Sequence, residues 1–561
     1  MPRFALPVLL LVISLGAATA HAPGQTATPA SVTTQLDRIF EKWNKPNSPG
    51  CALSVIQNAR IVYKHGYGIA DLDHDVPITP ATVFHVASVS KQFTAAAVAL
   101  LSQQGKLSLD DDVRKYIPEL PDLGARITIR HLIHHTSGLR DQWELLELAG
   151  WRYSLDLITD DDVLEMVSRQ TALNFRPGEK HLYCNTGYTL LAMIVKRISG
   201  QSFREFTRTH FFDPLGMKNT HFRDDHAEIV KNQAYGYNPA KGDTFGLSIT
   251  NFDTVGATSL LTTVEDLALW DQNFYDKRIG GSTFVEQLHE RGRLNNGEQL
   301  DYAFGLTLGK YRGLPIVEHS GGDAGYRAHL IRFPEQRFSV ACLCNTGSAS
   351  PGQLARQVAD VYLAKEFKEA PPIVQPNAES KLSPDQLAST VGLYWDRESD
   401  QFHRIVAKEN KLYAVFSDES LELMPLSENR FRLVNFPVEV RFEATPDGSW
   451  NMIQDSPALG GKPVSYERVA PISVSRTELA EYVGTYTSEE MEAVYRMAVD
   501  NDALVLKRLR HNPEKLEPAQ PSAFLASIGT MRFERDATSR VIGFVLNGGR
   551  VRNFRFTKKH D

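Results

Sequence analysis

The stretch from residue 93 to residue 101 is almost wholly apolar on every side when it is written as a helix. A helix without a polar face belongs in the interior, so other elements must cover it all round. Ser88 and Lys91 stand at its start, three residues apart and therefore on one face. A fold that buries this helix brings a serine and a lysine together inside the protein.

The segment Ser88-Val89-Ser90-Lys91 fits a nucleophile with its activator. The first turn of a helix has unpaired N–H groups and the positive end of the dipole, both of which favour negative charge. Burial lowers the pKa of a lysine, which lets it take the serine proton. A Ser-x-x-Lys spacing arises roughly once by chance in a chain of this composition, so the interpretation needs further motifs.

Length and charge narrow the choice of function. A chain of 561 residues predicts two to four domains. The formal net charge is −6, and acidic and basic residues are interspersed, which argues against a nucleic-acid partner. No spacing of paired cysteines typical of zinc is present.

The first twenty residues look like a secretory signal peptide. Arg3 precedes an apolar stretch from Leu6 to Leu15, and Ala18-Thr19-Ala20 provides small residues for cleavage. No later apolar run has the length to span a bilayer, so no transmembrane segment is expected. We therefore expect a periplasmic or secreted protein, cleaved near Ala20.

The four cysteines allow two interpretations. Cys342 and Cys344 share one face of an expected strand, Cys51 lies in another strand, and Cys184 is remote from both. The favoured interpretation is four small buried hydrophobic side chains, and the alternative is one cross-strand disulfide.

The pattern of residues 35–370 predicts an α+β domain. Residues 51–70 resemble a β-hairpin, and three strands are expected at 317–321, 326–333 and 338–344. Residues 82–300 between them are mainly helical in pattern, and a helix at 353–369 closes the unit. The expected fold is one antiparallel sheet, built from both ends of the domain and flanked by helices.

The remainder of the chain contains an internal repeat. Prolines mark a linker at 371–384, after which short alternating strands replace the helical pattern. Leu387-Ala388-x-x-Val391-Gly392-x-Tyr394 recurs from Leu479 to Tyr486, and Arg441-Phe442-Glu443 recurs as Arg532-Phe533-Glu534. This predicts two small all-β antiparallel barrel modules, at 385–470 and 476–558.

Two further motifs accompany the serine and lysine. Tyr183-Cys184-Asn185 precedes an expected helix at 189–198, and alternate residues of an extended segment face the same way. His319-Ser320-Gly321-Gly322 lies on the first late strand, where glycines let a substrate approach the backbone.

Together these motifs resemble those of the serine β-lactamase and penicillin-binding (D,D-peptidase) superfamily, in its class C-like branch. Ser88-Val89-Ser90-Lys91, Tyr183-Cys184-Asn185 and His319-Ser320-Gly321 occur in the order of that family. The segment from His134 to Leu139 also resembles that branch. The tail is similar in architecture to that of three-domain D-aminopeptidases.

The resemblance implies a role for each motif residue. Ser88 would attack a carbonyl carbon and form an acyl-enzyme, while Lys91 and Tyr183 share the proton transfers. Asn185, His319, Ser320, Gly321 and Gly322 would bind the substrate. The N–H groups of Ser88 and Gly322 would form the oxyanion hole. No metal or cofactor is implied.

The third motif departs from the β-lactamase pattern, because His319 replaces the usual lysine. A histidine with an ordinary pKa is mostly neutral at pH 7, so it would attract a substrate carboxylate weakly and with a pH dependence. This favours the peptidase and esterase members over efficient β-lactam hydrolysis. We expect a secreted serine hydrolase acting on small D-residue-containing peptides, of the D-aminopeptidase or D,D-carboxypeptidase type.

Three alternatives remain open. The protein could be an esterase or weak β-lactamase of the same fold, or a non-catalytic penicillin-binding-like receptor.

His131, His134 and His135 could suggest zinc, but capping and loop hydrogen bonds are preferred because no acidic neighbour lies in the same turn. For Arg327 and His329, contact with solvent and contact with substrate are equally compatible with the sequence. The sequence does not indicate an oligomeric state.

Overall fold

The computed structural model describes residues 30–369, 384–416, 419–434, 438–446, 450–455 and 463–559. The predicted signal peptide, residues 1–20, lies outside the described residues, as does the predicted linker apart from residue 384. Within the described ranges, no helix combines the length and the apolar character needed to cross a membrane.

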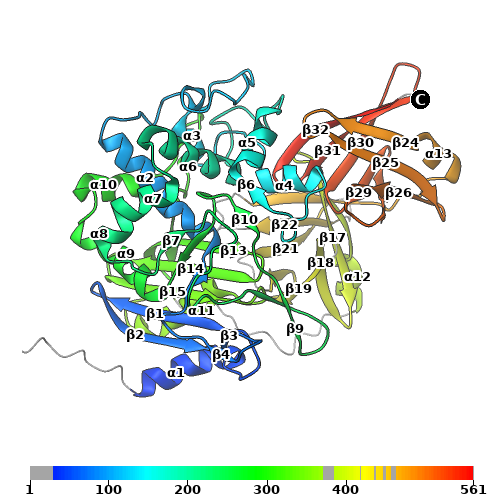
Figure 1. Cartoon of the computed structure of the whole chain (residues 1–561). Helices are drawn as coiled ribbons and strands as arrows, with labels where there is room; N and C mark the ends of the chain where they lie inside the picture. The colour runs from blue at the N-terminus through cyan, green and yellow to red at the C-terminus, as the bar shows by residue number, and fades with distance from the viewer. Residues whose placement is uncertain are drawn as a thin grey trace, which may run out of the picture.

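A six-stranded antiparallel sheet is the centre of the first part of the chain, in the order β12-β13-β14-β15-β1-β2 (Figure 1). Its strands are β1 (Cys51–Gln57), β2 (Arg60–Tyr67), β12 (Thr307–Tyr311), β13 (Leu314–Asp323), β14 (Tyr326–Phe333) and β15 (Phe338–Cys344). The N-terminal hairpin therefore pairs with the last strand of the late group. This confirms the predicted sheet built from both ends, and adds β12, which the sequence pattern did not indicate.

Helices cover both faces of this sheet. α1 (Ala30–Phe40) and α11 (Pro351–Tyr362) pack on one face, where Leu36, Phe40 and Val358 are fully buried. The other face supports the helical region, formed by α2 (Lys91–Gln103), α3 (Ile129–Ile133), α4 (Gln142–Leu148), α5 (Asp160–Ser168), α6 (Asn185–Ser199), α7 (Phe203–Thr207), α8 (Asp213–Leu215), α9 (Val264–Asp276) and α10 (Gly281–Leu288). Short strands connect these helices: β3 (Ile69–Asp71), β4 (Val76–Pro77), β5 (Phe84–His85), β6 (Ile158–Thr159), β7 (His221–Phe222), β8 (Tyr237–Pro239), β9 (Phe245–Leu247), β10 (Phe252–Asp253) and β11 (Leu260–Thr262).

The apolar helix α2 lies in the interior, as its composition predicts. Phe93 is fully buried and its ring lies 4.6 Å from that of Trp270 on α9. Regular helix begins at Lys91, and Ser88 belongs to a 3₁₀ turn, Ala87–Ser90, directly before it. The buried helix thus holds Lys91 rigidly beneath Ser88.

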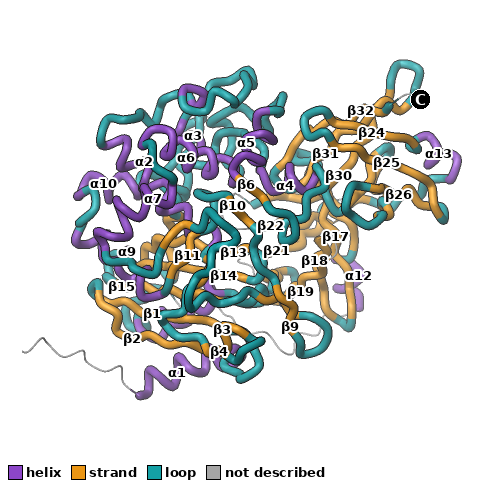
Figure 2. Tube along the Cα trace, in the orientation of Figure 1, coloured by secondary structure: helices purple, strands orange, loops and turns teal. Residues whose placement is uncertain are grey.

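The tail consists almost wholly of strands and lies to one side of the helical region (Figure 2). After the short helix α12 (Pro384–Thr390), eight strands close into a barrel: β16 (Gly392–Asp396), β17 (Gln401–Lys408), β18 (Lys411–Phe416), β19 (Glu419–Pro425), β20 (Arg430–Leu433), β21 (Glu439–Ala444), β22 (Trp450–Asp455) and β23 (Val464–Val469). We call this the first tail module. It confirms the expected antiparallel barrel.

The second tail module begins with α13 (Arg476–Glu481) and forms a nine-stranded antiparallel sheet. Its strands are β24 (Gly484–Ser488), β25 (Ala493–Asp500), β26 (Ala503–Lys507), β27 (Glu514–Lys515), β28 (Glu517–Gln520), β29 (Ala523–Ala526), β30 (Gly529–Arg535), β31 (Val541–Gly548) and β32 (Val551–Lys558). In the described pairing β27 and β28 are the two edges of this sheet, so the two modules differ in closure.

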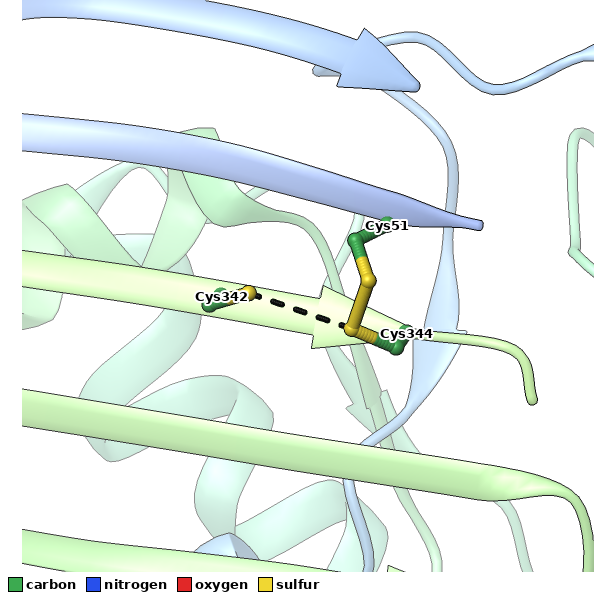
Figure 3. Close-up of side chains that lie close together, drawn as sticks. All are labelled: Cys51, Cys342 and Cys344. Atoms are coloured by element: carbon green, nitrogen blue, oxygen red, sulfur yellow. Dashed lines mark hydrogen bonds between the residues drawn. A yellow bond between two sulfur atoms is a disulfide. The ribbon is translucent and has the colours of Figure 1, made fainter. Parts of the chain in front are cut away.

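One disulfide joins the neighbouring strands β1 and β15 of the central sheet, which corrects the favoured interpretation of the cysteines. Cys51 on β1 and Cys344 on β15 are direct cross-strand partners and are bonded (Figure 3). Cys342 lies on the same face, with its Sγ 3.8 Å from the Sγ of Cys344, and is a free buried thiol like Cys184. This disulfide closes a loop that contains most of the domain. Such a cross-link restricts the unfolded chain and stabilises the fold by up to about 5 kcal/mol.

Candidate active site

The turn that carries Ser88 is fixed by close backbone contacts. Ala87 has a φ of +48°, a conformation that costs energy for a residue with a side chain and occurs preferentially at functional sites. The Ser90 hydroxyl donates to the Ala87 carbonyl at 2.5 Å and accepts from the Leu260 amide at 3.1 Å. Gly321 of β13 lies against this turn so closely that a Cβ there would be 2.2 Å from the Val86 carbonyl oxygen. The strand must therefore carry glycine at this position.

Lys91 is fully buried and makes three hydrogen bonds through its Nζ. It donates to Ser88 Oγ at 3.0 Å, to Asn185 Oδ1 at 2.8 Å and to the Ala257 carbonyl at 2.8 Å. Burial lowers the pKa of Lys91 to about 7, because the carboxylates of Asp323 and Asp141 offset the cost of burying the charge only in part. A substantial fraction of this amine is therefore neutral at pH 7 and can accept a proton.

Tyr183 lies beside the same ammonium. Its ring centre is 4.8 Å from Lys91 Nζ, and the His135 ring packs on it at 4.1 Å. Its buried hydroxyl has no aligned hydrogen-bond partner in the described part of the chain. Burial raises the pKa of Tyr183, and the nearby Ser88 hydroxyl opposes this rise. The phenol is thus neutral and directed toward the nucleophile.

Asn185 begins α6 and connects Lys91 to a buried carboxylate. Its Oδ1 accepts from Lys91, while its Nδ2 and its backbone amide donate to Asp141 Oδ2 at 2.9 and 2.6 Å. Asp141 is fully buried and also caps α4 by accepting from the Trp143 amide at 3.1 Å. All polar atoms of the Asn185 side chain are therefore used to orient the lysine.

His319 is held neutral, which corrects the expectation of a histidine with an ordinary pKa. Its Nδ1 is 2.6 Å from the Ser320 carbonyl and must donate, so its Nε2 accepts from the Tyr302 hydroxyl at 3.0 Å. Burial, together with the charge of Lys91, lowers the pKa of His319 to about 3. The imidazole carries no charge at pH 5 to 9, so it offers a substrate carboxylate no pH-dependent attraction.

The three residues after His319 divide between the two sides of β13. Gly321 is buried against the Ser88 turn, whereas Ser320 and Gly322 are exposed. Because their backbone lies next to the nucleophile, they border the space in front of Ser88. His319 and Tyr183 also converge there, with ring centres 6.3 Å apart.

Asp323 is a charged neighbour of the site that the sequence analysis missed. It follows Gly322 directly, is buried, and accepts from His85 Nε2 at 2.9 Å and from the hydroxyls of Thr258 and Tyr153. These donors hold the pKa of Asp323 below its usual range despite burial. The signal in the sequence was a carboxylate next to a Gly-Gly pair at a strand end.

The other histidines and Arg327 face different partners. His131 caps α3 by accepting from the Thr128 amide at 3.2 Å, and His135 Nδ1 accepts from the Cys184 amide at 3.1 Å. His134 packs its ring edge to face with Phe304. His329 is buried on the sheet face opposite His319, with its Nε2 3.0 Å from Glu318 Oε2, and Arg327 donates to the Ala324 carbonyl at 2.9 Å. His329 therefore lies away from the candidate site.

The domain that carries these residues matches a known protein family. The Beta-lactamase family matches residues 36–363, which is more than half of the chain. The chain belongs to the Beta-lactamase family. It is a serine hydrolase of the penicillin-binding protein and β-lactamase fold.

Relatives within this family include proteins with different names. Penicillin-binding protein 4* of Bacillus subtilis (strain 168) is 30% identical over 435 residues, which cover 74% of this chain and 95% of that protein. A D-aminopeptidase of Gluconobacter oxydans (strain 621H) is 27% identical, over 64% of this chain and 65% of its own length.

Solved structures of the family share the fold. The octameric penicillin-binding protein homologue from Pyrococcus abyssi aligns with a TM-score of 0.56 at 22% identity, covering 78% of this chain and 99% of that one. The D-amino acid amidase from Ochrobactrum anthropi SV3, complexed with L-phenylalanine amide, aligns with a TM-score of 0.51 at 22% identity, covering 60% and 100%. At such identities these structures establish the fold alone.

Proposed function

We propose that this protein cleaves amide or ester bonds through an acyl-enzyme on Ser88. The observation that carries the proposal is the 3.0 Å hydrogen bond between Lys91 Nζ and Ser88 Oγ, on a lysine whose pKa burial lowers to about 7. A neutral amine at that distance takes the serine proton as Oγ attacks the carbonyl carbon.

The remaining steps use groups around the same hydroxyl. Tyr183 donates its phenol proton to the leaving group and takes back the proton that Lys91 holds, since its phenol is neutral and lies beside Lys91 and Ser88. The N–H groups of Ser88 and Gly322 stabilise the oxyanion, and Asn185, His319, Ser320 and Gly321 border the substrate. Water then hydrolyses the ester on Ser88 and releases the acyl group.

The charges around the site favour a substrate with a free amine, and we propose small D-residue-containing peptides as that substrate. His319 is neutral, so the third motif has no cation for the carboxylate of a β-lactam or of a peptide C-terminus. Asp323 is a nearby anion, and it favours a substrate ammonium. The relative named D-aminopeptidase supports this choice over the D,D-carboxypeptidase type, with simple esters second.

We also propose that the protein is exported to the periplasm or beyond. The N-terminal sequence supports this, and the Cys51–Cys344 disulfide fits an oxidising compartment.

Labelling and turnover test the proposal together. A fluorophosphonate should modify Ser88, as located by mass spectrometry, and Ser88→Ala should abolish labelling and lower turnover at least about a thousandfold. Ser102→Ala, a serine at the far end of α2, is the matched control and should behave like the wild type. Turnover that survives in Ser88→Ala contradicts the assignment.

A substrate panel then separates the alternatives. D-alanyl-p-nitroanilide, a p-nitrophenyl ester and a chromogenic cephalosporin report aminopeptidase, esterase and β-lactamase activity. We expect the anilide and the ester to be cleaved and the cephalosporin to be cleaved slowly or not at all. A Ser88 adduct without any turnover identifies a penicillin-binding-like receptor instead.

A further inference from the structure

The hairpin between β31 and β32 of the second tail module docks beside the candidate active site. In Figure 1 these strands approach α4, and the contacts are made by the tip, Gly549 and Arg550. Arg550 Nε donates to Glu144 Oε1 at 2.9 Å, its backbone amide donates to the same carboxylate, and its carbonyl accepts from Asn174 Nδ2 at 2.8 Å. Gly549 has a φ of +49°, and a Cβ there would lie 2.6 Å from Glu144 Oε1, so a larger residue at the tip would displace this carboxylate.

The same guanidinium contacts the carboxylate that orients the catalytic lysine. Arg550 NH2 forms an ion pair with Asp141 Oδ1 at 3.2 Å. The other oxygen of Asp141 accepts both donors of Asn185, whose Oδ1 accepts from Lys91. One continuous series of polar contacts therefore runs from the end of the chain to Lys91.

We propose that Arg550 is a positioning residue for the active site, acting through Asp141 and Asn185 to orient Lys91 and to keep it able to accept a proton. The inference rests on the proposed function, because it concerns the same lysine. Arg550 reaches the site through other residues and is not itself assigned to contact the reacting atoms.

Electrostatics make an arginine necessary at this position. Asp141 and Glu144 are two carboxylates in one buried region, and burial together with Asp141 favours the neutral form of Glu144. Arg550 neutralises both, and their charges raise its own pKa. Without it, an unpaired carboxylate would remain near Lys91, which is costly and favours the ammonium. The forked guanidinium binds two carboxylates at once, which a lysine cannot do with the same geometry.

The groups that face Lys91 come from several elements. They are Asp323 of β13, Asp141 before α4, Arg550 of the hairpin tip, Cys184 before α6, the rings of Tyr183 and Tyr188, and the imidazoles of His135 and His319. The carboxylates raise the pKa of Lys91, whereas Arg550 lowers it. Loss of Arg550 and loss of Asp141 should therefore move the titration in opposite directions.

The test compares Arg550→Gln, Asp141→Asn and the double variant in the full-length protein. The rate of Ser88 labelling by a fluorophosphonate is measured from pH 5 to pH 10. In Arg550→Gln we expect the acidic limb of the pH–rate profile to shift to higher pH by about one unit. The labelling rate should therefore fall about fivefold at pH 7 and recover above pH 9. Asp141→Asn should move the limb to lower pH, and the double variant should lie near the wild type.

Two further variants separate charge from docking. Arg550→Lys keeps the positive charge and should keep the limb at the wild-type pH, even if the rate at the plateau falls. Arg555→Gln is the matched control, because this arginine of β32 is exposed and pairs with Glu534 at 2.6 Å. Thermal unfolding of each variant reports whether the fold is retained.

Direct titration distinguishes failure of this inference from failure of the proposed function. The ¹⁵N signal of Lys91 Nζ, assigned with Lys91→Met, is followed against pH in the wild type and in Arg550→Gln. An unmoved titration in a folded Arg550→Gln overturns the role of Arg550, whatever the activity. Wild-type protein that fluorophosphonate does not modify at Ser88 contradicts the proposed function, and the titration then decides the role of Arg550 alone.

Discussion

The two tail modules begin with the same local packing. In each, the repeated tyrosine is fully buried and donates its hydroxyl to the backbone carbonyl four residues earlier: Tyr394 to Thr390 at 2.9 Å and Tyr486 to Tyr482 at 2.8 Å. The repeated phenylalanine packs on that tyrosine, with ring centres 5.6 Å apart for Phe442 and 5.8 Å for Phe533. The internal repeat therefore marks a shared core motif.

The modules differ in how they contact the rest of the protein. The core of the first module is separate, and within the described ranges an exposed ion pair between Lys180 and Glu398 joins it to the catalytic domain. The core of the second module is continuous with that of the helical region. There Tyr495 donates to the Leu148 carbonyl at 2.8 Å, and Arg140 forms a 2.7 Å ion pair with Glu490.

This difference shows that a repeated core leaves hairpin tips free to diverge. The β31–β32 tip of the second module is Gly549-Arg550, which reaches Asp141. The corresponding connection of the first module, residues 456–463, contains no arginine. The repeated packing residues define each module, whereas the contact with Asp141 comes from a turn residue of the second module.

Reversing the charge of Arg550 at the tip should give the largest difference in activity between variants of the two modules. Arg550→Glu places a third carboxylate beside Asp141 and Glu144, which favours the protonated form of Lys91 and disrupts docking. We expect kcat/KM at pH 7 to fall at least about a hundredfold. The matched reversal in the first module, Arg397→Glu, changes an exposed arginine and should alter kcat/KM less than about twofold. Equal losses in both variants would mean that the modules serve the site alike.

Loss of the buried docking arginine should have the next largest effect. Arg140 is 2% exposed, contacts Glu490, and donates to the carbonyls of Arg552 and Asn553 at 3.2 Å. Arg140→Ala removes the donor to both carbonyls and the buried cation beside Glu490, so the free energy of unfolding should fall by about 2 kcal/mol. Lys180→Ala removes one exposed pair of the first module and should cost less than about 1 kcal/mol. Urea unfolding of both variants measures the difference, and equal midpoints contradict it.

The parts of this architecture that sequence patterns could predict depend on local residues. β14 and β15 begin and end where their apolar runs and flanking turns indicated, and α2 is buried because it has no polar face. The three motifs also meet, because Ser88 and Tyr183 stand just before α2 and α6 and β13 carries His319 past the Ser88 turn. Cys51 and Cys344 could not be paired in advance, because strand register depends on the whole sheet.

The supporting charges could not be predicted from local patterns. Asp141 and Arg550 are single residues in connecting segments, Asp323 ends β13, and the three lie far apart along the chain. Their importance comes from tertiary contacts with Lys91 and its neighbours. The state of His319 was also misjudged, because its pKa depends on burial and on Lys91 rather than on residue type.

The pH dependence of kcat/KM in the wild type tests the protonation state of Lys91 directly. With Lys91 near a pKa of about 7 and active as the neutral amine, kcat/KM should rise with pH and level off above about pH 8. Below about pH 6 it should fall about tenfold per pH unit. His319, with a pKa near 3, should add no second limb in this range.

The control for this profile lies in the first module. In the described residues, Asp396 has no contact with Arg550, Asp141, Asn185 or Lys91. Its carboxylate accepts from the Glu398 amide at 3.0 Å. Asp396→Asn should leave the limb in place. A limb that moves in this variant contradicts the assignment of the limb to Lys91 and its neighbours.

The smallest effect is expected at the contact between the two modules. Asp400 of the first module accepts from Arg532 Nε at 2.9 Å and from Asn547 Nδ2 at 3.3 Å, both in the second. Asp400→Asn keeps an oxygen acceptor and loses only a partly exposed charge, so unfolding should change by less than about 1 kcal/mol and kcat/KM by less than twofold. Because the second module is held by Arg140 and Arg550, its tip should keep its place without this ion pair. An alkaline shift of the pH limb in Asp400→Asn would instead show that the first module controls the tip from a distance.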